Sequence, residues 1–386
     1  MPLPSHTWEG VLKVLWHANA PWTATGYGQQ TRLFLPFVAE AHDVALSQNH
    51  GYAGGMSEWE GLKVYPNGFD RYGNDVIPSW ADDHMHPDEG WIFALYDGWV
   101  FNNPALKRFH MACWAPVDHQ PLPLIVAEAM TELNVVPVAM SRFGQDQFTR
   151  AGLEALYVPH GVDNEFFPRD RANSRELLQV PDDCFLVGMN SANKAAGQLH
   201  RKGFAEAFHA FTQMPDDAVL WVHAESDGMM QGWDLKRLAS GFGIEDRVVF
   251  SNQVEYRLGF SVDWLAQFYS AIDVLLSPSY GEGFGVPIVE AQACGTPVIV
   301  TDFTAMSELL GDGWKVGGQV VWHEGQQAFW KIPNVGQLVQ ALKEAYNRPQ
   351  EVSDAAVEFA EAYRPERVWE DHFQPVLENL RERINA

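Results

Sequence analysis

The sequence predicts an α/β protein made of two Rossmann-like domains that face a central cleft. Its 386 residues are enough for two domains at roughly 150 residues each. Short apolar runs alternate with amphipathic helical stretches in both halves, a pattern typical of parallel sheets covered by helices on both faces. Such sheets bind ligands beyond the carboxyl ends of their strands, so the expected ligand site lies between the domains.

The first half starts as a strand, a turn and a helix. An apolar run at 11–18 predicts the strand, TATGYGQQ predicts a glycine-containing turn, and 31–41 predicts an amphipathic helix. Strand-like runs recur at WIFALY, MACWAPV and VVPVAMS, with the helical stretch LIVAEAMTEL before the last of them. Residues 50–90 are rich in Gly, Trp, Asp and His and are expected to be irregular.

The second half repeats this alternation after a Pro- and Gly-containing segment at 157–168, which is expected to be a linker. The predicted strands are CFLVGMNS, AVLWVHA, RVVFSNQ, DVLLSPS and TPVIVTD. The predicted helices contain KGFAEAFHAF, LKRLASG and VDWLAQFYSAI, follow Pro287, and recur near 335–346, 351–362 and 366–384.

Composition narrows the class of protein. The chain is 46% hydrophobic and 13% aromatic, which predicts a globular protein rather than a disordered one. Its formal net charge of −24 argues against general affinity for nucleic acid or anionic membranes, both of which need clustered Lys and Arg.

Apolar run length, the first ten residues and the cysteines predict the cellular location of the protein. No apolar run reaches the roughly 18 to 20 residues that span a bilayer, and MPLPSHTWEG does not read as a signal peptide. Three cysteines without C-x-x-C spacing predict neither a disulfide framework nor a thiolate zinc site. A reducing cytoplasm is the expected location.

The stretch SYGEGFGVPIVEAQACGTPVI at 279–299 is the most informative in the chain. Its glycines allow unusual dihedrals and close approach to a ligand, and Pro287 suits the first turn of a helix. Glu282 on the loop and Glu290 one turn into the helix are expected to border one pocket. The alternative is a solvent-facing loop glutamate and a helix-start glutamate favoured by the macrodipole.

The pattern E-G-F-G-x-P-x-x-E, followed by A-x-A-C-G-T-P-V-I-V-T-D, resembles the donor-site signature of retaining GT-B glycosyltransferases, in particular glycosyltransferase family 4. Further matches lie in GYG after the first strand, VAMSRFGQDQF, VPHGVDNEFFP and RKGF. The resemblance covers most of the chain, apart chiefly from 50–90. It implies a GT-B fold in which C-terminal helices cross back to the N-terminal domain. The implied domains are 1–168 on the acceptor side, 169–365 on the nucleotide-sugar side, and 366–386 packing back on the first.

The resemblance also assigns the donor site. Glu290 would accept hydrogen bonds from ribose hydroxyls, and Glu282, placed in the catalytic group, would lie near the hydroxyls of the transferred sugar. Carboxylates suit this task because they are pure acceptors with room for two hydroxyl donors each. The N–H groups that would hold the sugar or phosphate belong to Gly283, Phe284, Gly285 and Val286.

A local basic spot is expected at HRKGF. Arg201 and Lys202 would stabilise the departing diphosphate there, the alternative being two exposed helix-start cations. The family often carries an Arg just after the preceding strand's glycine, whereas here Met189 and Asn190 follow Gly188. Lys194 is the predicted substitute.

Residues on the remaining sides of the cleft are assigned by the same resemblance. Gly26, Tyr27 and Gly28 would approach the donor phosphate or the acceptor, the alternative being a plain tight turn. His119 is expected to face the reacting sugar with Asp118 beside it, although a lone histidine is more often structural. Val254 is assigned to the substrate-binding set.

The expected activity is therefore retaining transfer of a hexose-like sugar from a nucleotide-sugar donor, with no cofactor and no metal. Sparse basic residues in the first 110 positions predict a soluble glycoside, protein or polysaccharide acceptor, no nucleic-acid partner and no stable membrane association. The segment 56–100 would help to shape the acceptor site through its tryptophans, unless these are core residues. Two alternatives remain: a GT-B nucleotide-sugar epimerase, which needs no acceptor, and a non-catalytic nucleotide-sugar or glycan-binding module.

Overall fold

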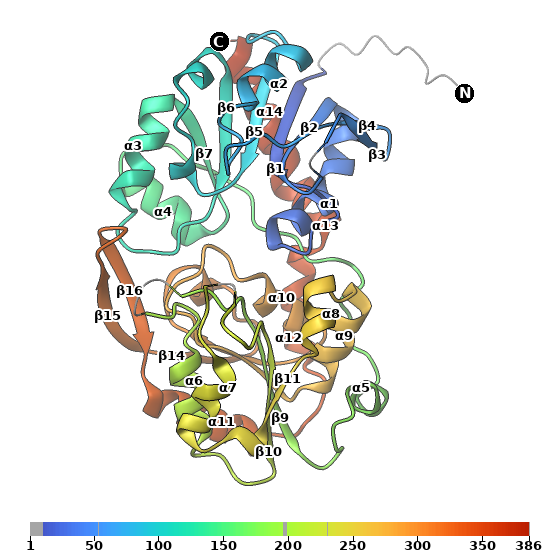
Figure 1. The fold of residues 1–386 in the computed structure, drawn as a ribbon, viewed down its shortest axis with the longest axis vertical. Coiled ribbons are helices and arrows are strands. Elements are labelled where there is room, and N and C mark those ends of the chain that lie inside the picture. The colour runs from blue at the N-terminus through green and yellow to red at the C-terminus, as the bar shows by residue number, and fades with distance from the viewer. Residues whose placement is uncertain (1–10, 53, 196–198, 230, 386) are drawn as a thin grey trace.

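The computed structural model describes residues 11–52, 54–195, 199–229 and 231–385 and has two α/β lobes stacked along its long axis (Figure 1). The first strand, β1, lies in the upper lobe, and the last helices run from the lower lobe to the upper one (Figure 1). The predicted fold class is confirmed: each lobe is built on a mainly parallel sheet with helices packed against it.

The N-terminal domain holds an eight-stranded sheet in the order β3-β4-β2-β1-β5-β6-β7-β8, parallel except for the β3–β4 pair. Its strands are β1 Lys13–Asn19, β2 Asp43–His50, β3 Ser57–Trp59, β4 Leu62–Tyr65, β5 Gly90–Leu95, β6 His110–Ala115, β7 Val135–Ala139 and β8 Leu156–Tyr157. Its helices are α1 Gly26–Ala41, α2 Ile77–His84, α3 Leu124–Leu133 and α4 Arg142–Arg150, with 3₁₀ turns at η1 Gly98–Val100 and η2 Pro104–Arg108.

The C-terminal domain holds a six-stranded parallel sheet in the order β11-β10-β9-β12-β13-β14. Its strands are β9 Phe185–Asn190, β10 Ala218–His223, β11 Val248–Phe250, β12 Val274–Ser277, β13 Val298–Thr301 and β14 Gly313–Val316. Its helices are α5 Arg171–Leu178, α6 Phe204–Phe211, α7 Leu235–Phe242, α8 Gln253–Leu258, α9 Val262–Ala271, α10 Val286–Ala293 and α11 Val335–Tyr346, with 3₁₀ turns at η3 Glu245–Arg247 and η4 Thr304–Glu308. Every residue of β12 and β13 is buried, as expected for central strands covered on both faces.

The C-terminal tail crosses back to the N-terminal domain, as predicted. It consists of α12 Asp354–Ala360, η5 Glu361–Tyr363, α13 Pro365–Val368, the π-helical turn η6 Trp369–Phe373 and α14 Gln374–Asn385. The ring of Phe373 stacks on Trp16 of β1 at 5.8 Å and on Phe34 of α1 at 5.2 Å. The indole N–H of Trp91 on β5 donates to the carbonyl of Leu380 at 2.9 Å. These buried aromatic contacts tie the end of the chain to the first sheet.

Two local predictions are wrong, and one element was missed. Residues 50–90 are not wholly irregular, since β3, β4 and α2 lie there. GYG is not a turn that precedes a helix but the first turn of α1, where the side chain of Thr25 accepts a hydrogen bond from the N–H of Gly28 at 3.1 Å. The antiparallel hairpin of β15 Gly318–His323 and β16 Ala328–Pro333 was not predicted at all.

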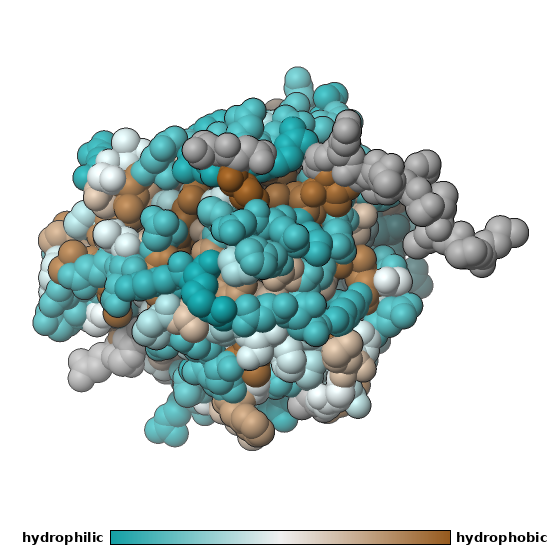
Figure 2. Space-filling model, turned by 90° about the horizontal axis from the view of Figure 1, so that it is seen from above, coloured by the Kyte–Doolittle hydropathy of each residue, from teal (hydrophilic) through white to brown (hydrophobic). Residues whose placement is uncertain are grey.

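The surface is mostly polar at the end of the N-terminal domain. Figure 2 shows hydrophilic residues over most of that face, with hydrophobic ones exposed in small separate groups. Within the described residues, no helix is both long and apolar enough to cross a membrane.

Candidate active site

A cleft of about 740 Å³ lies between the two domains, where the sequence places the ligand site. Its walls come from the start of α1, the loop after β9, the loop after β12 and the start of α10. Because β9 and β12 are neighbours in a parallel sheet, their carboxyl ends bring these loops together. The predicted residues that line the cleft are Gly26, Lys194, Lys202, Glu282, Gly285, Val286 and Glu290.

Glu290 is held in place by a short chain of hydrogen bonds. It lies on α10 and is only 4% exposed. The hydroxyl of Tyr269 donates to its Oε2 at 2.7 Å and accepts from Asn190 Nδ2 at 2.7 Å. No described residue donates to Oε1, which leaves that oxygen available to a ligand in the cleft. Burial raises the pKa of Glu290 to about 7, although the Tyr269 hydrogen bond opposes this shift.

Glu282 joins the two cations that the sequence placed nearby. Its Oε1 pairs with the ammonium of Lys202, and its Oε2 lies 3.0 Å from Arg201 Nη1. Arg201 Nη1 also donates to the carbonyl of Gly281 at 2.7 Å and lies 3.5 Å from Asp118 Oδ2. The result is a cluster of fixed charges contributed by both domains.

This cluster sets the ionisation of its members. Burial alone would raise the pKa of Glu282, but Lys202 and Arg201 outweigh burial and lower it to about 2. The same balance, with His119 and Arg201 as the partners, lowers the pKa of Asp118 to about 2. Burial and the charge of Arg201 lower the pKa of Lys202, while Glu282 opposes this. Both carboxylates therefore stay ionised around neutral pH.

Two of the three glycines in the G-E-G-F-G loop pack closely against the N-terminal domain. A Cβ on Gly281 would lie 2.1 Å from the carbonyl oxygen of Asp118, and one on Gly283 would lie 2.2 Å from Pro116 Cβ. The close approach that requires these two glycines is thus to the N-terminal domain rather than to a ligand. Gly285, with φ +113°, begins α10 and does line the cleft.

Several predicted residues lie outside the main cleft. The ring of Phe284 is in the core, 5.3 Å from the ring of His160 and 5.7 Å from that of Tyr363, and neither Phe284 nor Gly283 lines the cleft. Val254, on α8, is 68% exposed and lines neither this cleft nor the smaller pocket described next. Tyr27 and Gly28 also lie beside the cleft without lining it.

His119, Asp118 and Arg201 line a second, smaller pocket of about 250 Å³. His119 Nδ1 lies 2.6 Å from Asp118 Oδ1, and its Nε2 lies 2.9 Å from Nδ1 of His323 on the β15–β16 hairpin. Lys194 borders both cavities, which places the pocket next to the cleft. The predicted residues that do line a cavity therefore fall into two adjoining groups.

Comparisons with known proteins give a similar family for part of the chain and a similar fold for the whole chain. Residues 195–347, which include the basic spot and both glutamates, match the family model "Glycosyl transferases group 1". This segment is similar to that family. The whole chain has the GT-B fold: it superposes on sucrose-phosphate synthase from Thermosynechococcus elongatus with a TM-score of 0.74 and 17% identity, covering 96% of this chain and 99% of that one. It also superposes on Anabaena HepE in complex with UDP-glucose with a TM-score of 0.67 and 16% identity, covering 95% and 99%.

The curated sequence relatives match about half of this chain or less. The D-inositol 3-phosphate glycosyltransferase of Geodermatophilus obscurus is 35% identical over 170 residues, or 41% of this chain and 35% of that protein. The one from Mycolicibacterium smegmatis is 32% identical over 209 residues, or 53% of this chain and 42% of that protein. The match thus spans less than half the length of each of these two relatives.

Sequence reasoning missed several residues that complete the smaller pocket. Asp97 follows β5 just as Asp118 follows the neighbouring strand β6, so an acidic residue after each of two predicted strands was an available signal. His323, Gln326 and Trp330 come from the hairpin. The sequence signal for the hairpin was two short runs rich in Val, Ile, Phe and Trp, QVVWH and AFWKI, on either side of a glycine-containing turn.

Two tryptophans of the segment 56–100 have distinct places. Trp99 lines the smaller pocket. Trp91 lies in the core, 3% exposed, against the C-terminal helix.

Proposed function

We propose that the chain is a retaining glycosyltransferase that moves a hexose-like sugar from a nucleoside diphosphate donor to an acceptor hydroxyl. The observation that carries this proposal is the charge arrangement in the cleft: Lys202 pairs with Glu282 on the same wall that presents Glu290. HepE, with a similar fold, was solved with UDP and glucose, which supports a donor of this chemistry. The group 1 family match and the relatives named as glycosyltransferases support transfer as the reaction.

In the proposed reaction the diphosphate leaves and the acceptor attacks from the same face of the sugar. The bond from the anomeric carbon to the diphosphate oxygen breaks, a bond to the acceptor oxygen forms, and the acceptor proton passes to the departing diphosphate. Lys202 and Arg201 supply preorganised positive charge where negative charge develops. Glu282 holds both cations, and its low pKa keeps it charged while it accepts from sugar hydroxyls.

The acceptor in this proposal is a soluble glycoside, protein or polysaccharide, and the reaction needs neither a cofactor nor a metal. A thermal-shift panel of nucleoside diphosphates and their hexose conjugates tests the donor, because a ligand at 100 times its Kd adds about 2.7 kcal/mol to the folded state. We expect one nucleotide to raise the melting temperature and its hexose conjugate to support product formation that EDTA does not change. Isomerised donor without transfer would select an epimerase instead, and binding without turnover would select a binding module.

Replacing Glu290 with alanine is expected to weaken binding of that nucleoside diphosphate by about 1 to 3 kcal/mol, since a ribose hydroxyl pair loses its acceptor in a partly buried site.

In the parent protein, affinity for the nucleoside diphosphate is expected to rise as pH rises through the Glu290 pKa of about 7, because only the ionised carboxylate accepts from both hydroxyls. Calorimetry across this range measures both effects.

Two further variants sharpen the Glu290 experiment. Glu290→Gln should bind the nucleoside diphosphate weakly, and its affinity should not show the rise near pH 7 that comes from Glu290. Any pH dependence that remains in this variant belongs to titration of the nucleotide. Glu176→Ala removes an exposed helix glutamate of the same domain and should bind as the parent does. Parental affinity in Glu290→Ala would remove Glu290 from ribose binding.

A further inference from the structure

The β15–β16 hairpin leaves the C-terminal domain and docks on the N-terminal domain. It rises along the side of the molecule toward the upper lobe (Figure 1). Gln120 and Phe329 exchange two backbone hydrogen bonds, of 3.1 and 2.9 Å, across the domain boundary. His323 adds the 2.9 Å contact with His119, and at the hairpin's base Lys331 N donates to the carbonyl of Tyr280 at 2.9 Å. The hairpin therefore has a fixed position beside the cleft.

Docking of the hairpin gives the small pocket an aromatic wall. Trp330 is 2% exposed, and its ring stacks on His323 at 4.0 Å and on His119 at 4.6 Å. Trp99 contributes a further aromatic ring from the N-terminal domain. The indole N–H of Trp330 is buried and meets no acceptor in the described part of the chain. Buried donors of this kind are normally satisfied, so a ligand or water oxygen is the remaining partner.

Two polar side chains of the pocket, those of Asp97 and Gln326, have no hydrogen-bond partner among the other described residues. Asp97 lies at the carboxyl end of β5, and no other described residue donates to its carboxylate. Burial and the charge of Asp118 raise the pKa of Asp97 to about 6, with Arg201 opposing them. The side-chain amide of Gln326, at the hairpin turn, makes no hydrogen bond with any described residue and offers both a donor and an acceptor.

The pocket adjoins the proposed reaction centre. Arg201 lines the pocket while the next residue, Lys202, lines the main cleft, and both bind Glu282. A volume of about 250 Å³ suits a single small ring. A ring held there lies next to the groups that would stabilise the departing diphosphate.

We propose that this composite pocket binds a neutral, hydroxyl-bearing sugar ring of the acceptor, and that the β15–β16 hairpin determines acceptor specificity. Aromatic faces pack against the C–H surface of such a ring, while Asp97 and Gln326 take up its hydroxyls. An anionic ring is disfavoured beside Asp97, which forms no ion pair with a described cation, and Arg201 is already engaged by Glu282 and Asp118; the other cation of the lining, Lys194, lies where the pocket meets the main cleft. The inference rests on the proposed function, and the sugar of the donor has the same chemistry, so the test must separate the two.

Saturation-transfer NMR without any donor tests the pocket directly. The probes are the methyl glycosides of glucose, galactose and mannose, myo-inositol, and D-inositol 3-phosphate. We expect at least one neutral probe to bind the parent protein, and to bind about tenfold or more weakly to Asp97→Ala and to Gln326→Ala. The matched control is Gln319→Ala, an exposed position on the same hairpin that lines neither cavity, which should bind as the parent does.

The affinity of each variant for the nucleoside diphosphate and its sugar conjugate shows whether the pocket binds the sugar of the donor or that of the acceptor. Unchanged nucleotide and nucleotide-sugar affinity in Asp97→Ala and Gln326→Ala, with weakened glycoside binding, supports the acceptor pocket. A parallel loss of nucleotide-sugar affinity would assign the pocket to the donor sugar and overturn the inference. Binding of D-inositol 3-phosphate alone, or of no probe, would overturn the neutral-ring chemistry. Failure of the proposed function is a separate result, namely that no nucleoside diphosphate binds.

Discussion

Replacing Lys202 with alanine is expected to lower kcat by roughly 10²-fold or more, on the scale seen when one preorganised electrostatic donor is removed. Lys202 is the cation that lines the cleft, and it is fixed by Glu282, so it needs no reorganisation as the diphosphate departs. Its loss also leaves Glu282 with Arg201 as its one remaining cationic partner among the described residues. Initial rates at saturating donor measure the effect.

The control for Lys202 is Lys236→Ala. Lys236 is an exposed lysine of the same domain that also pairs with a carboxylate, that of Asp227, but lines neither cavity. The Lys236→Ala variant should have the kcat of the parent protein. A Lys202→Ala protein that folds normally and matches the parent in kcat would show that the cleft cation does not stabilise the leaving group.

The alternation of apolar runs and amphipathic helices was enough to predict the two sheets. Strands such as β12 and β13 are buried on both faces, so their sequences are continuous apolar runs that stand out locally. Short β3 and β4 at a sheet edge are partly exposed, and no such run marks them. GYG was misread because a glycine-rich loop and the first turn of a helix share the same local signal until the Thr25 cap is recognised.

Residues of the main cleft could be placed together from the sequence because they lie in two short segments. Glu282 and Glu290 belong to one loop and the helix that follows it, and Arg201 and Lys202 are adjacent. The smaller pocket could not be predicted, because its members meet only when the domains do. His119 and His323, for example, are 204 residues apart in the chain. Contacts of this range depend on tertiary packing, which local patterns do not encode.

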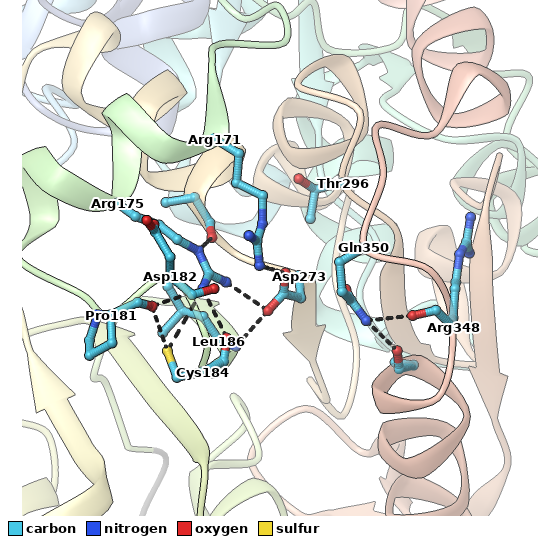
Figure 3. A network of polar contacts seen from close by, with 12 residues as sticks. Arg171, Arg175, Pro181, Asp182, Cys184, Leu186, Asp273, Thr296, Arg348 and Gln350 are labelled. Carbon is cyan, nitrogen blue, oxygen red and sulfur yellow. Dashed lines mark hydrogen bonds and ion pairs between the residues drawn. The ribbon is translucent and has the colours of Figure 1, made fainter.

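A second large effect concerns a buried ion-pair network far from the proposed chemistry. Figure 3 shows the guanidinium groups of Arg171 and Arg175 converging on Asp273. The side chains of Arg175 and Asp273 are 0% and 1% exposed, and their Nη2 and Oδ2 atoms lie 2.8 Å apart. Asp273 Oδ2 also accepts from the backbone N–H of Leu186 on β9 at 2.7 Å, and Arg175 Nη1 donates to the carbonyl of Cys184 at 2.9 Å. The network thus fastens α5 to the first strand of the C-terminal sheet.

Asp273→Ala is therefore expected to lower the free energy of unfolding of the C-terminal domain by about 3 to 5 kcal/mol, because Arg175 stays buried without its counter-charge. Arg171→Ala is the matched control: it removes a partly exposed cation, 2.6 Å from the same carboxylate, and should cost no more than about 1 kcal/mol. Urea unfolding of both variants measures the difference from the midpoint shift at unchanged m-value. Equal stability of the two variants would mean that the buried pair contributes no more than the exposed one, and that backbone carbonyls alone satisfy Arg175.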